Sequence, residues 1–521
     1  MNSVAIYDTT LRDGMQGEKV TFTLEEKLAV AERLDTLGIS YIEGGFPLAN
    51  PKEEAFFREV RKLKFRKARL AAFGSTRRPG GKVGEDPHML ALLQAETPVV
   101  TIVGKSWTRH VTDVLRTDLD ENLRMIEESA ALLTQAGREV IYDAEHFFDG
   151  YFENPEYALK TLRAARNGGA AVVVLCDTNG GTITGPFLKT LQVVQAQKDL
   201  PFGVHLHNDT GMAVAHSVLA VEYGAQQIQG TLNGIGERTG NANLSTIIPN
   251  LVFKLGLPVV TEEEAARLTV VSRWVLETAN LNPDERQPYV GLSAFAHKAG
   301  QHADVIQKNP ELMEHLDGEK VGNGRRILLS ELAGKSTLVH KLQPFGSFTK
   351  ESPEINAITR LLKEREALGY EYEAAEGSFE LLVLKVLGRY QPLFELLHYV
   401  VESFRSGEEN VKTMARVRLL CGGRERAGAA VHPGPVAAID LAFRDAMESQ
   451  HAFIKEVKLL DYKVRVLAGD AGAKVRVFSQ FTDGAETWST VGVSENIIEA
   501  SWQAMVDAYE FKHHRLLNGT A

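Results

Sequence analysis

Short apolar runs alternate with amphipathic segments through the first half of the chain, up to about residue 260. The run 171–175 is apolar throughout, which is typical of a buried strand, whereas 24–37 places leucine and alanine at helical spacing. Thr23 and Glu26 form a capping box in front of that helix, and Gly38 fits its end. The same pattern predicts eight strands, at residues 4–11, 41–45, 69–73, 99–103, 140–145, 171–177, 203–207 and 227–232.

Eight strand–helix units predict an α/β protein with a closed (β/α)8 TIM barrel, and the alternative is an open doubly wound sheet. No GxGxxG or P-loop fingerprint follows the first strand, which disfavours a nucleotide-binding sheet. A barrel brings the C-terminal ends of its strands to one mouth, where the active sites of this fold lie. Polar residues gather at or near those predicted ends: Arg12, Asp13, Glu43, Glu145, Asp177, Thr178, His205, His207 and Asn233.

The second half of the chain has a different pattern. Residues up to about 390 are mostly helical, and the charged segment 351–368 is typical of a connecting helix. Beyond residue 391, strand patterns followed by a helical pattern occur twice, which suggests a duplicated α+β unit. Its strands are expected at 414–420, 462–467, 474–478 and 488–493, and its helices at 436–447 and 497–511. We therefore expect three parts: a barrel domain at 1–265, helical linker subdomains at 266–390 and a C-terminal domain at 391–521.

His205 and His207 lie in the predicted seventh strand, one residue apart. Alternate side chains of a strand point to the same face, so the two imidazoles project together and could hold one metal ion. The alternative is an edge strand with two solvated polar residues, and the pair alone does not decide between them. Asp13, which is expected to end a strand, and the Gly/Asn-rich turn 234–241 add oxygen donors. A mixed nitrogen and oxygen set favours a divalent cation that stays partly open to substrate.

Composition narrows the class of protein further. The chain has 521 residues, and its net charge of −10 argues against a nucleic-acid partner, because phosphate binding rests on clustered positive charge. There is no apolar run of membrane-spanning length and no secretory signal, so we expect no membrane partner. Cys176 and Cys421 lie far apart and give no disulfide framework, which predicts a cytoplasmic protein in which Cys176 is a buried thiol.

Three motifs resemble the signatures of the metal-dependent Claisen-condensing and lyase superfamily, which includes isopropylmalate, homocitrate and citramalate synthases. They are Asp-Thr-Thr-Leu-Arg-Asp-Gly-Met-Gln at 8–16, His-Leu-His-Asn-Asp at 205–209 and the turn at 234–241. Residues 142–150 and 488–500 look most like the citramalate synthases of this family. The resemblance covers essentially the whole chain. It implies a metal-containing barrel, a helical linker region and a C-terminal regulatory domain that binds an amino acid.

The resemblance implies that four side chains hold a divalent metal ion, either Mn²⁺ or Mg²⁺ or else Zn²⁺: Asp13, His205, His207 and Asn241. Arg12 and Thr178 would then engage the carboxylate of a 2-oxoacid substrate. Glu145 and His302 would handle protons near the acetyl group of acetyl-CoA, and His302 in this family reaches the barrel of a partner subunit.

Two observations weaken this transfer of roles. Related enzymes often carry an aromatic residue two positions before the catalytic glutamate, where this chain has Asp143, and the segment after His302 aligns only loosely. From the residues alone, the stretch 294–304 around His302 is more simply a solvated loop or a helix start.

The implied reaction condenses acetyl-CoA with pyruvate and water to citramalate and CoA, on the route to isoleucine. Isoleucine is then the expected inhibitor, bound by the C-terminal domain, and a homodimer is the expected assembly. Glycine-containing approaches to two helix starts, at 431–435 and 491–496, could receive an amino-acid carboxylate, although ordinary helix capping is the simpler interpretation.

Three alternatives remain open. An isopropylmalate or homocitrate synthase would use a longer 2-oxoacid. One or two extra methylenes change the binding free energy in an apolar pocket by only about 1–3 kcal/mol, so the sequence does not separate these substrates. Phe73 and Val103 are candidates to line that pocket. A lyase would cleave a carbon–carbon bond in the same barrel, although the duplicated C-terminal unit favours a regulated synthase. A non-catalytic amino-acid sensor, stabilised by its metal ion, would bind metal and effector without turning over a substrate. The presence of Arg12, Glu145 and His302 disfavours this alternative.

Overall fold

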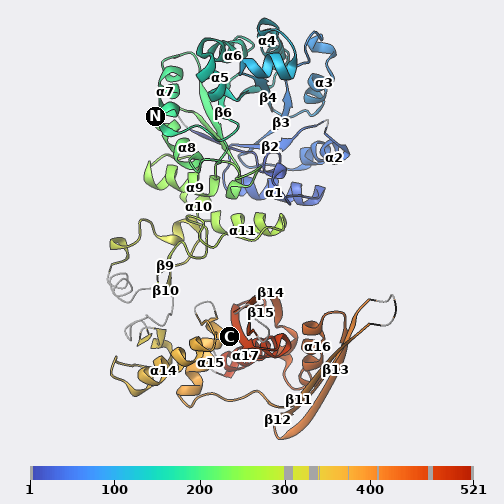
Figure 1. Cartoon of the computed structure of the whole chain (residues 1–521), viewed down its shortest axis with the longest axis vertical. Helices are drawn as coiled ribbons and strands as arrows, with labels where there is room; N and C mark the ends of the chain where they lie inside the picture. The colour runs from blue at the N-terminus through green and yellow to red at the C-terminus, as the bar shows by residue number, and fades with distance from the viewer. Residues whose placement is uncertain are drawn as a thin grey trace. The chain divides into compact units, whose positions relative to one another are not determined.

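A computed structural model describes most of the chain: residues 4–47, 49–297, 309–327, 338–339, 341–372, 375–405, 407, 410–467 and 473–517. The chain divides into two compact units, residues 1–296 with 314–326 and residues 297–313 with 327–521 (Figure 1). The expected division into three parts remains a prediction.

The first unit is built on a closed barrel of eight parallel strands in sequence order, with helices around its outside (Figure 1). The predicted TIM barrel is therefore confirmed, and the open doubly wound sheet is wrong. The strands are β1 (Ala5–Asp8), β2 (Tyr41–Gly45), β3 (Arg69–Ser75), β4 (Val99–Lys105), β5 (Glu139–Glu145), β6 (Val172–Asp177), β7 (Phe202–Leu206) and β8 (Gln227–Gly230). The helices are α1 (Leu24–Thr36), α2 (Pro51–Glu59), α3 (Pro87–Gln94), α4 (Leu119–Gln135), α5 (Phe147–Glu153), α6 (Pro155–Asn167), α7 (Thr184–Gln195), α8 (Ala213–Glu222), α9 (Leu244–Pro249), α10 (Glu262–Ala265) and α11 (Leu268–Thr278).

The first helix shows how the sequence sets these elements. The side chain of Thr23 accepts from the amide of Glu26 at 3.2 Å, and the carboxylate of Glu26 accepts from the amide of Thr23 at 2.7 Å, so the predicted capping box is present. The apolar face of α1 buries Val30, Ala31 and Leu34 against the barrel strands. This outer core lies between strands and helices.

A smaller apolar cluster lies apart from this outer core and consists mainly of residues of the barrel strands: Tyr7, Ala71, Val99, Ile141, Val174 and Cys176. Side chains that point into a barrel pack in layers, so the interior is a filled core and not a pore. Cys176 is buried, as the sequence predicts.

Strand β1 is shorter than predicted, and Asp13 does not end it. The Asp8 carboxylate accepts from the amide of Thr10 at 2.8 Å and from its hydroxyl at 3.0 Å, which starts a turn. The carbonyl of Thr9 then accepts from the amides of Arg12, Asp13 and Gly14. Asp13 therefore lies on a tight turn beyond the strand, where backbone hydrogen bonds fix the position of its main chain.

The second unit contains two antiparallel three-stranded sheets, each followed by a helix, and the duplicated α+β unit is confirmed. The first repeat is β11 (Glu395–Phe404), β12 (Lys412–Cys421), β13 (Arg424–His432) and α16 (Pro435–Met447). The second is β14 (Lys458–Val466), β15 (Val475–Thr482), β16 (Thr487–Ser494) and α17 (Ile497–Leu517). Helices α14 (Pro353–Ala367) and α15 (Glu376–Val386) precede them, and the short strands β9 (Ala296–His297) and β10 (Arg326–Ile327) pair with each other.

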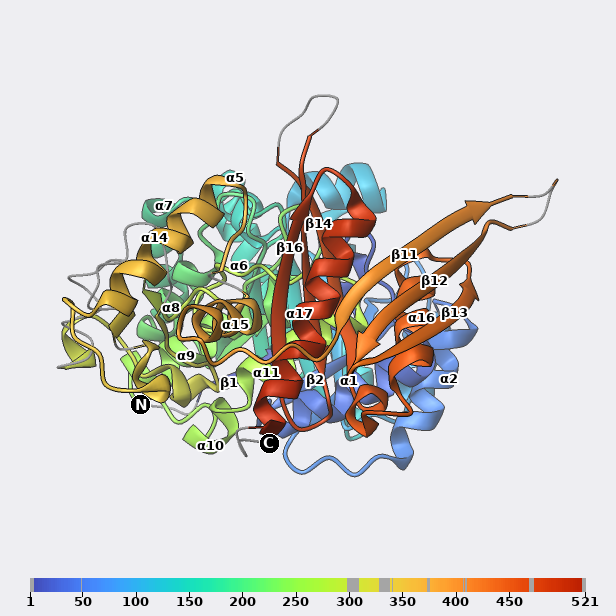
Figure 2. The same cartoon turned by 90° about the horizontal axis from the view of Figure 1, so that it is seen from below.

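Helix α16 packs on β12 and β13, and α17 packs on β15 and β16 (Figure 2). The two helices meet at Phe443 and Tyr509, whose rings lie 4.7 Å apart, and the Tyr509 hydroxyl donates to Asp440 at 2.6 Å. Both repeats carry a bulge near the start of the first strand, at Leu396/His398 and at Leu459/Asp461. The repeats thus share strand order and a local irregularity.

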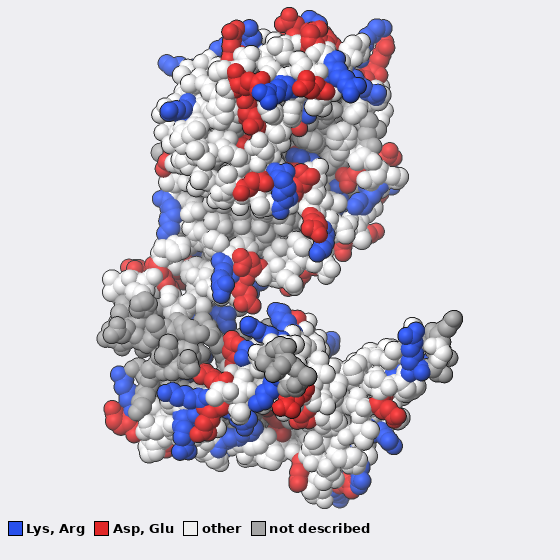
Figure 3. All heavy atoms as spheres, in the orientation of Figure 1, with Lys and Arg blue, Asp and Glu red and all other residues white. Residues whose placement is uncertain are grey.

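Surface charge and helix length complete the description. On the face drawn in Figure 3, basic and acidic side chains are interspersed over the barrel unit, so no single-sign patch dominates that face. None of the helices in the described parts of the chain combines the length and apolar character that a membrane crossing needs.

Candidate metal centre and active site

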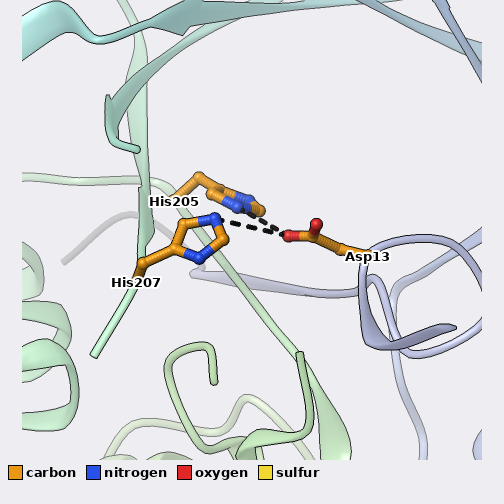
Figure 4. A group of neighbouring side chains, drawn as sticks. All are labelled: Asp13, His205 and His207. Carbon is orange, nitrogen blue, oxygen red and sulfur yellow. Dashed lines mark ion pairs between the residues drawn. The ribbon is translucent and has the colours of Figure 1, made fainter. Parts of the chain in front are cut away.

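Three side chains from distant parts of the sequence converge at the C-terminal end of the barrel. The carboxylate oxygen Oδ2 of Asp13 lies 3.0 Å from Nε2 of His205 and 3.7 Å from Nε2 of His207 (Figure 4). One ligand atom from each residue lies within 4.8 Å of the others, which is a spacing that suits one metal ion. Because β7 lies between β6 and β8 in a closed barrel, the edge-strand interpretation of the histidine pair is wrong.

Asn241 reaches the same place from the loop after β8. It pairs with His207 in an isolated antiparallel bridge, and its Nδ2 donates to the carbonyl of Ile235 at 3.2 Å. Its Oδ1 is buried without a hydrogen-bond partner in the described part of the chain. A buried oxygen left unpaired costs about 1–3 kcal/mol, so a bound cation would remove a real penalty. The four predicted ligands therefore fit a divalent ion.

The glycines of the loop 234–241 allow the side chain of Asn241 to pack closely against the loop backbone. A Cβ atom on Gly236 would lie 2.2 Å from Nδ2 of Asn241, and Gly240 has φ +90°, a conformation that other residues rarely adopt. The glycines of this turn thus have a local steric reason, because a side chain at Gly236 would clash with the Asn241 amide.

Arg12 lies between two carboxylates. Its Nε donates to Glu43 at 2.8 Å, its Nη1 lies 3.1 Å from Asp13, and its guanidinium carbon lies 4.0 Å above the ring of Phe73. Burial alone would lower the pKa of Arg12, but Asp13 and Glu43 raise it above its ordinary value. Burial would likewise raise the pKa of Asp13, but Arg12 and the histidines hold it well below its usual range. Arg12 and Asp13 therefore stay charged.

The two histidines beside Asp13, His205 and His207, differ in pKa. Burial, together with the neighbouring His205, lowers the pKa of His207 to about 4. Burial also disfavours the charged form of His205, but Asp13 raises its pKa above the ordinary value. His207 therefore presents a neutral imidazole, the form that binds metal ions.

Glu145 forms part of a second cluster at the same end of the barrel. It ends β5 and makes an ion pair with Lys105, which ends β4 in the adjacent register position. Ligand atoms of His110, Glu145 and His146 also lie within 4.8 Å of one another. Nδ1 of His146 lies 2.8 Å from Asp149, which orients the ring. A carboxylate, an ammonium and two imidazoles in one cluster can accept and donate protons.

Thr178 follows β6 and joins this second cluster. Its hydroxyl accepts from the amide of His146 at 2.8 Å, and its carbonyl accepts from Arg238 at 3.0 Å. Its predicted contact with a substrate carboxylate remains a prediction. His302 lies outside the described residues, so its role also remains a prediction.

Not every polar residue near a strand end belongs to the site. The Asp177 carboxylate accepts from the amide and hydroxyl of Thr182, and Asn233 donates to the carbonyl of Ser272. Both side chains therefore hold loops. Lys105 was missed, because the predicted fourth strand stopped at Val103.

Three family models match consecutive parts of the chain. HMGL-like matches residues 3–275, the homocitrate synthase post-HMGL domain-like family matches 289–368, and the LeuA allosteric (dimerisation) domain matches 373–513. The first match alone spans more than half of the 521 residues.

Curated relatives align over nearly the whole chain. An (R)-citramalate synthase from Aquifex aeolicus (strain VF5) is 52% identical over 98% of this chain and 97% of its own length. An (R)-citramalate synthase from Geobacter sulfurreducens is 46% identical, covering 99% and 98%. A probable 2-isopropylmalate synthase from Methanopyrus kandleri is 33% identical, covering 96% and 97%.

Proposed function

Because the chain belongs to the HMGL-like family and to its (R)-citramalate synthases, we propose that its barrel mouth condenses acetyl-CoA with pyruvate and water to citramalate and CoA. The chain is accordingly an enzyme that transfers an acyl group. The observation that carries the location of the site is the convergence of Asp13, His205 and His207 within 4.8 Å.

The donor atoms at the metal centre support a bound cation. The carboxylate oxygen Oδ2 of Asp13 lies close to both histidines, and Oδ1 of Asn241 is buried without a hydrogen-bond partner in the described part of the chain. A divalent ion held by Asp13, His205, His207 and Asn241 would supply a Lewis-acid positive charge there.

Arg12 is suited to bind substrate anions. Its guanidinium is permanently charged and planar, and the stack on Phe73 fixes its plane. It would donate to the carboxylate of pyruvate and to the ketone oxygen, which gains negative charge as the carbon–carbon bond forms. Thr178 would contribute a hydroxyl to the same carboxylate.

Glu145 would accept the proton that leaves the methyl group of acetyl-CoA, and Lys105 holds its carboxylate in place. The methylene carbon of the resulting acetyl-CoA enolate attacks the carbonyl carbon of pyruvate. Hydrolysis of the thioester then releases CoA. His302 from a partner subunit would be the second proton-handling group, as the family resemblance implies.

The C-terminal unit supports control by an amino acid and assembly into a homodimer. It matches the LeuA allosteric (dimerisation) domain. The first strand of each repeat exposes large apolar side chains, among them Leu397 and Phe404 on β11 and Leu460 and Val466 on β14. Exposed apolar groups of this kind are typical of protein interfaces. We infer that isoleucine is the inhibitor.

Metal removal tests this proposal. Purified enzyme treated with a chelator and passed into metal-free buffer should form no citramalate from pyruvate and acetyl-CoA, and Mn²⁺ or Mg²⁺ should restore the rate better than K⁺. Citramalate is measured by mass spectrometry and CoA by thiol release. Undiminished citramalate formation by protein shown to be free of metal would contradict the proposed centre.

A further inference from the structure

A buried chain of hydrogen bonds lies behind His205, on the side away from Asp13. It joins Asp143 on β5, Gln229 on β8 and His205 on β7, and all three side chains are at most 5% exposed. His205 and Gln229 are register partners on neighbouring strands. The barrel thus places the Gln229 amide beside the imidazole.

The hydrogen bonds of Gln229 fix which groups donate. Its Nε2 donates to Oδ1 of Asp143 at 3.0 Å and to Oε1 of Gln227 at 3.2 Å, so both amide protons are used. Its Oε1 is left to accept from Nδ1 of His205 at 2.9 Å. Nδ1 therefore carries the proton, and Nε2 of His205 is the atom that faces Asp13 at 3.0 Å.

His207 has no comparable support. Its Nδ1 is buried and finds no hydrogen-bond partner within the described part of the chain. Of the two histidines at the centre, His205 is therefore the one whose tautomer and ring orientation the protein determines through a side chain.

We propose that Gln229, itself held by Asp143, is a positioning residue that presents Nε2 of His205 to the metal ion. The inference rests on the proposed metal centre. Metal-binding histidines commonly donate their other ring N–H to such a partner, and loss of that partner weakens metal binding by about 10–100-fold. Asp143 acquires a role here: its carboxylate accepts one amide proton and thereby turns the amide oxygen toward His205.

The test compares Gln229→Leu with Asn323→Leu in the full chain, using the dissociation constant for Mn²⁺ alone, measured by titration calorimetry. Asn323 is a matched control, because it is also a buried carboxamide, but it donates to the carbonyls of Tyr289 and Gly291 and not to the network around His205. We expect the Gln229 variant to bind Mn²⁺ about 10–100-fold more weakly and the Asn323 variant to stay within about twofold of the wild type.

A double variant guards against a general loss of structure. Gln229→Glu alone places two carboxylates against each other and should weaken Mn²⁺ binding. Gln229→Glu combined with Asp143→Asn exchanges the amide and the carboxylate, so a donor still meets an acceptor and His205 keeps its partner. We expect this exchange to restore Mn²⁺ binding.

The outcomes separate the two ideas. Wild-type binding in the Gln229→Leu variant, or no rescue by the exchange in a folded double variant, would overturn the positioning role and leave the proposed function standing. If the wild-type enzyme itself binds no Mn²⁺, the proposed metal centre fails and the positioning role fails with it.

Discussion

Single side chains decide what the barrel mouth can hold. Arg12 makes ion pairs with both Asp13 and Glu43, and Asn241 adds an oxygen with no protein partner among the described residues. The spacing of His205 and His207 predicted that their side chains share one face, because strand alternation is a local rule, whereas the metal interpretation also needed Asp13 and the turn 234–241. The pairing of Lys105 with Glu145 was missed, because the predicted fourth strand stopped at Val103 and apolar periodicity does not report the register between two strands.

Removal of a ligand should abolish metal-dependent turnover. For Asp13→Ala or His207→Ala we expect kcat/KM for pyruvate to fall by about 100-fold or more, together with the Mn²⁺ bound per chain. His216→Ala is the matched control, because this buried histidine stacks on Phe187 and contacts none of the ligands. The control should keep its bound metal. Either ligand variant retaining full activity in metal-controlled buffer would refute the site.

Loss of the Lys105 ammonium should slow proton transfer without loosening the metal. We expect Lys105→Met to lower kcat by about 10–100-fold, because the Glu145 carboxylate loses the partner that fixes it. Its Mn²⁺ dissociation constant should not change. Lys160→Met removes a comparable but exposed Lys–Glu pair and should leave kcat unaltered. An unaltered kcat in the Lys105 variant would show that the ion pair has no part in the reaction.

Secondary-structure elements were predictable where burial leaves an apolar pattern in the sequence. The barrel strands are buried along most of their length and appear as short apolar runs, whereas the helices α16 and α17 follow from periodicity. Strand β11 was missed because most of its residues are exposed on both faces, and β13 because its glycine and alanine residues give little alternation. The early end of β1 depends on hydrogen bonds of the Asp8 side chain, which periodicity does not report.

Helix α17 carries a buried carboxylate that should make stability depend on pH. Glu510 accepts from the amide of Leu393, and burial raises its pKa to about 7 from an ordinary 4.5. The folded state therefore holds this proton more tightly than the unfolded chain. The stability gained is fully present below about pH 4.5 and is lost as the pH rises through about 7.

Glu510→Gln should keep that stability at alkaline pH. We expect the variant to exceed the wild type by about 1–3 kcal/mol in free energy of unfolding at pH 8. At pH 4 the two should agree, because the wild-type carboxyl is protonated there too, and this comparison is the internal control. Denaturant unfolding followed by circular dichroism measures both. A constant difference across the pH range would mean that the substitution acts through packing.

At the scale of the whole molecule, a catalytic barrel and a duplicated α+β unit occur in one chain. A regulatory role requires that an effector bind two states of the enzyme with different affinity, so binding alone is not control. The amides of Ile498 and Glu499 at the start of α17 already donate to the side chain of Asn496, so they are not free to bind an effector carboxylate. Ordinary capping, the simpler of the two sequence interpretations, therefore explains that helix start.

Titration with branched-chain amino acids tests the proposed regulation by isoleucine. We expect isoleucine to lower the rate of citramalate formation by the full-length enzyme at millimolar levels, and leucine and valine to act more weakly. Indifference to all three amino acids would remove the regulatory proposal. Strong inhibition by leucine would instead favour an isopropylmalate synthase.

The choice of 2-oxoacid tests the account most directly. Full-length enzyme with Mn²⁺ and acetyl-CoA is offered pyruvate, 2-oxoisovalerate or 2-oxoglutarate, and kcat/KM for CoA release is measured with identification of each product. The account predicts that pyruvate is used best and gives citramalate. Preference for 2-oxoisovalerate or 2-oxoglutarate, or metal binding without CoA release from any of the three, would contradict it.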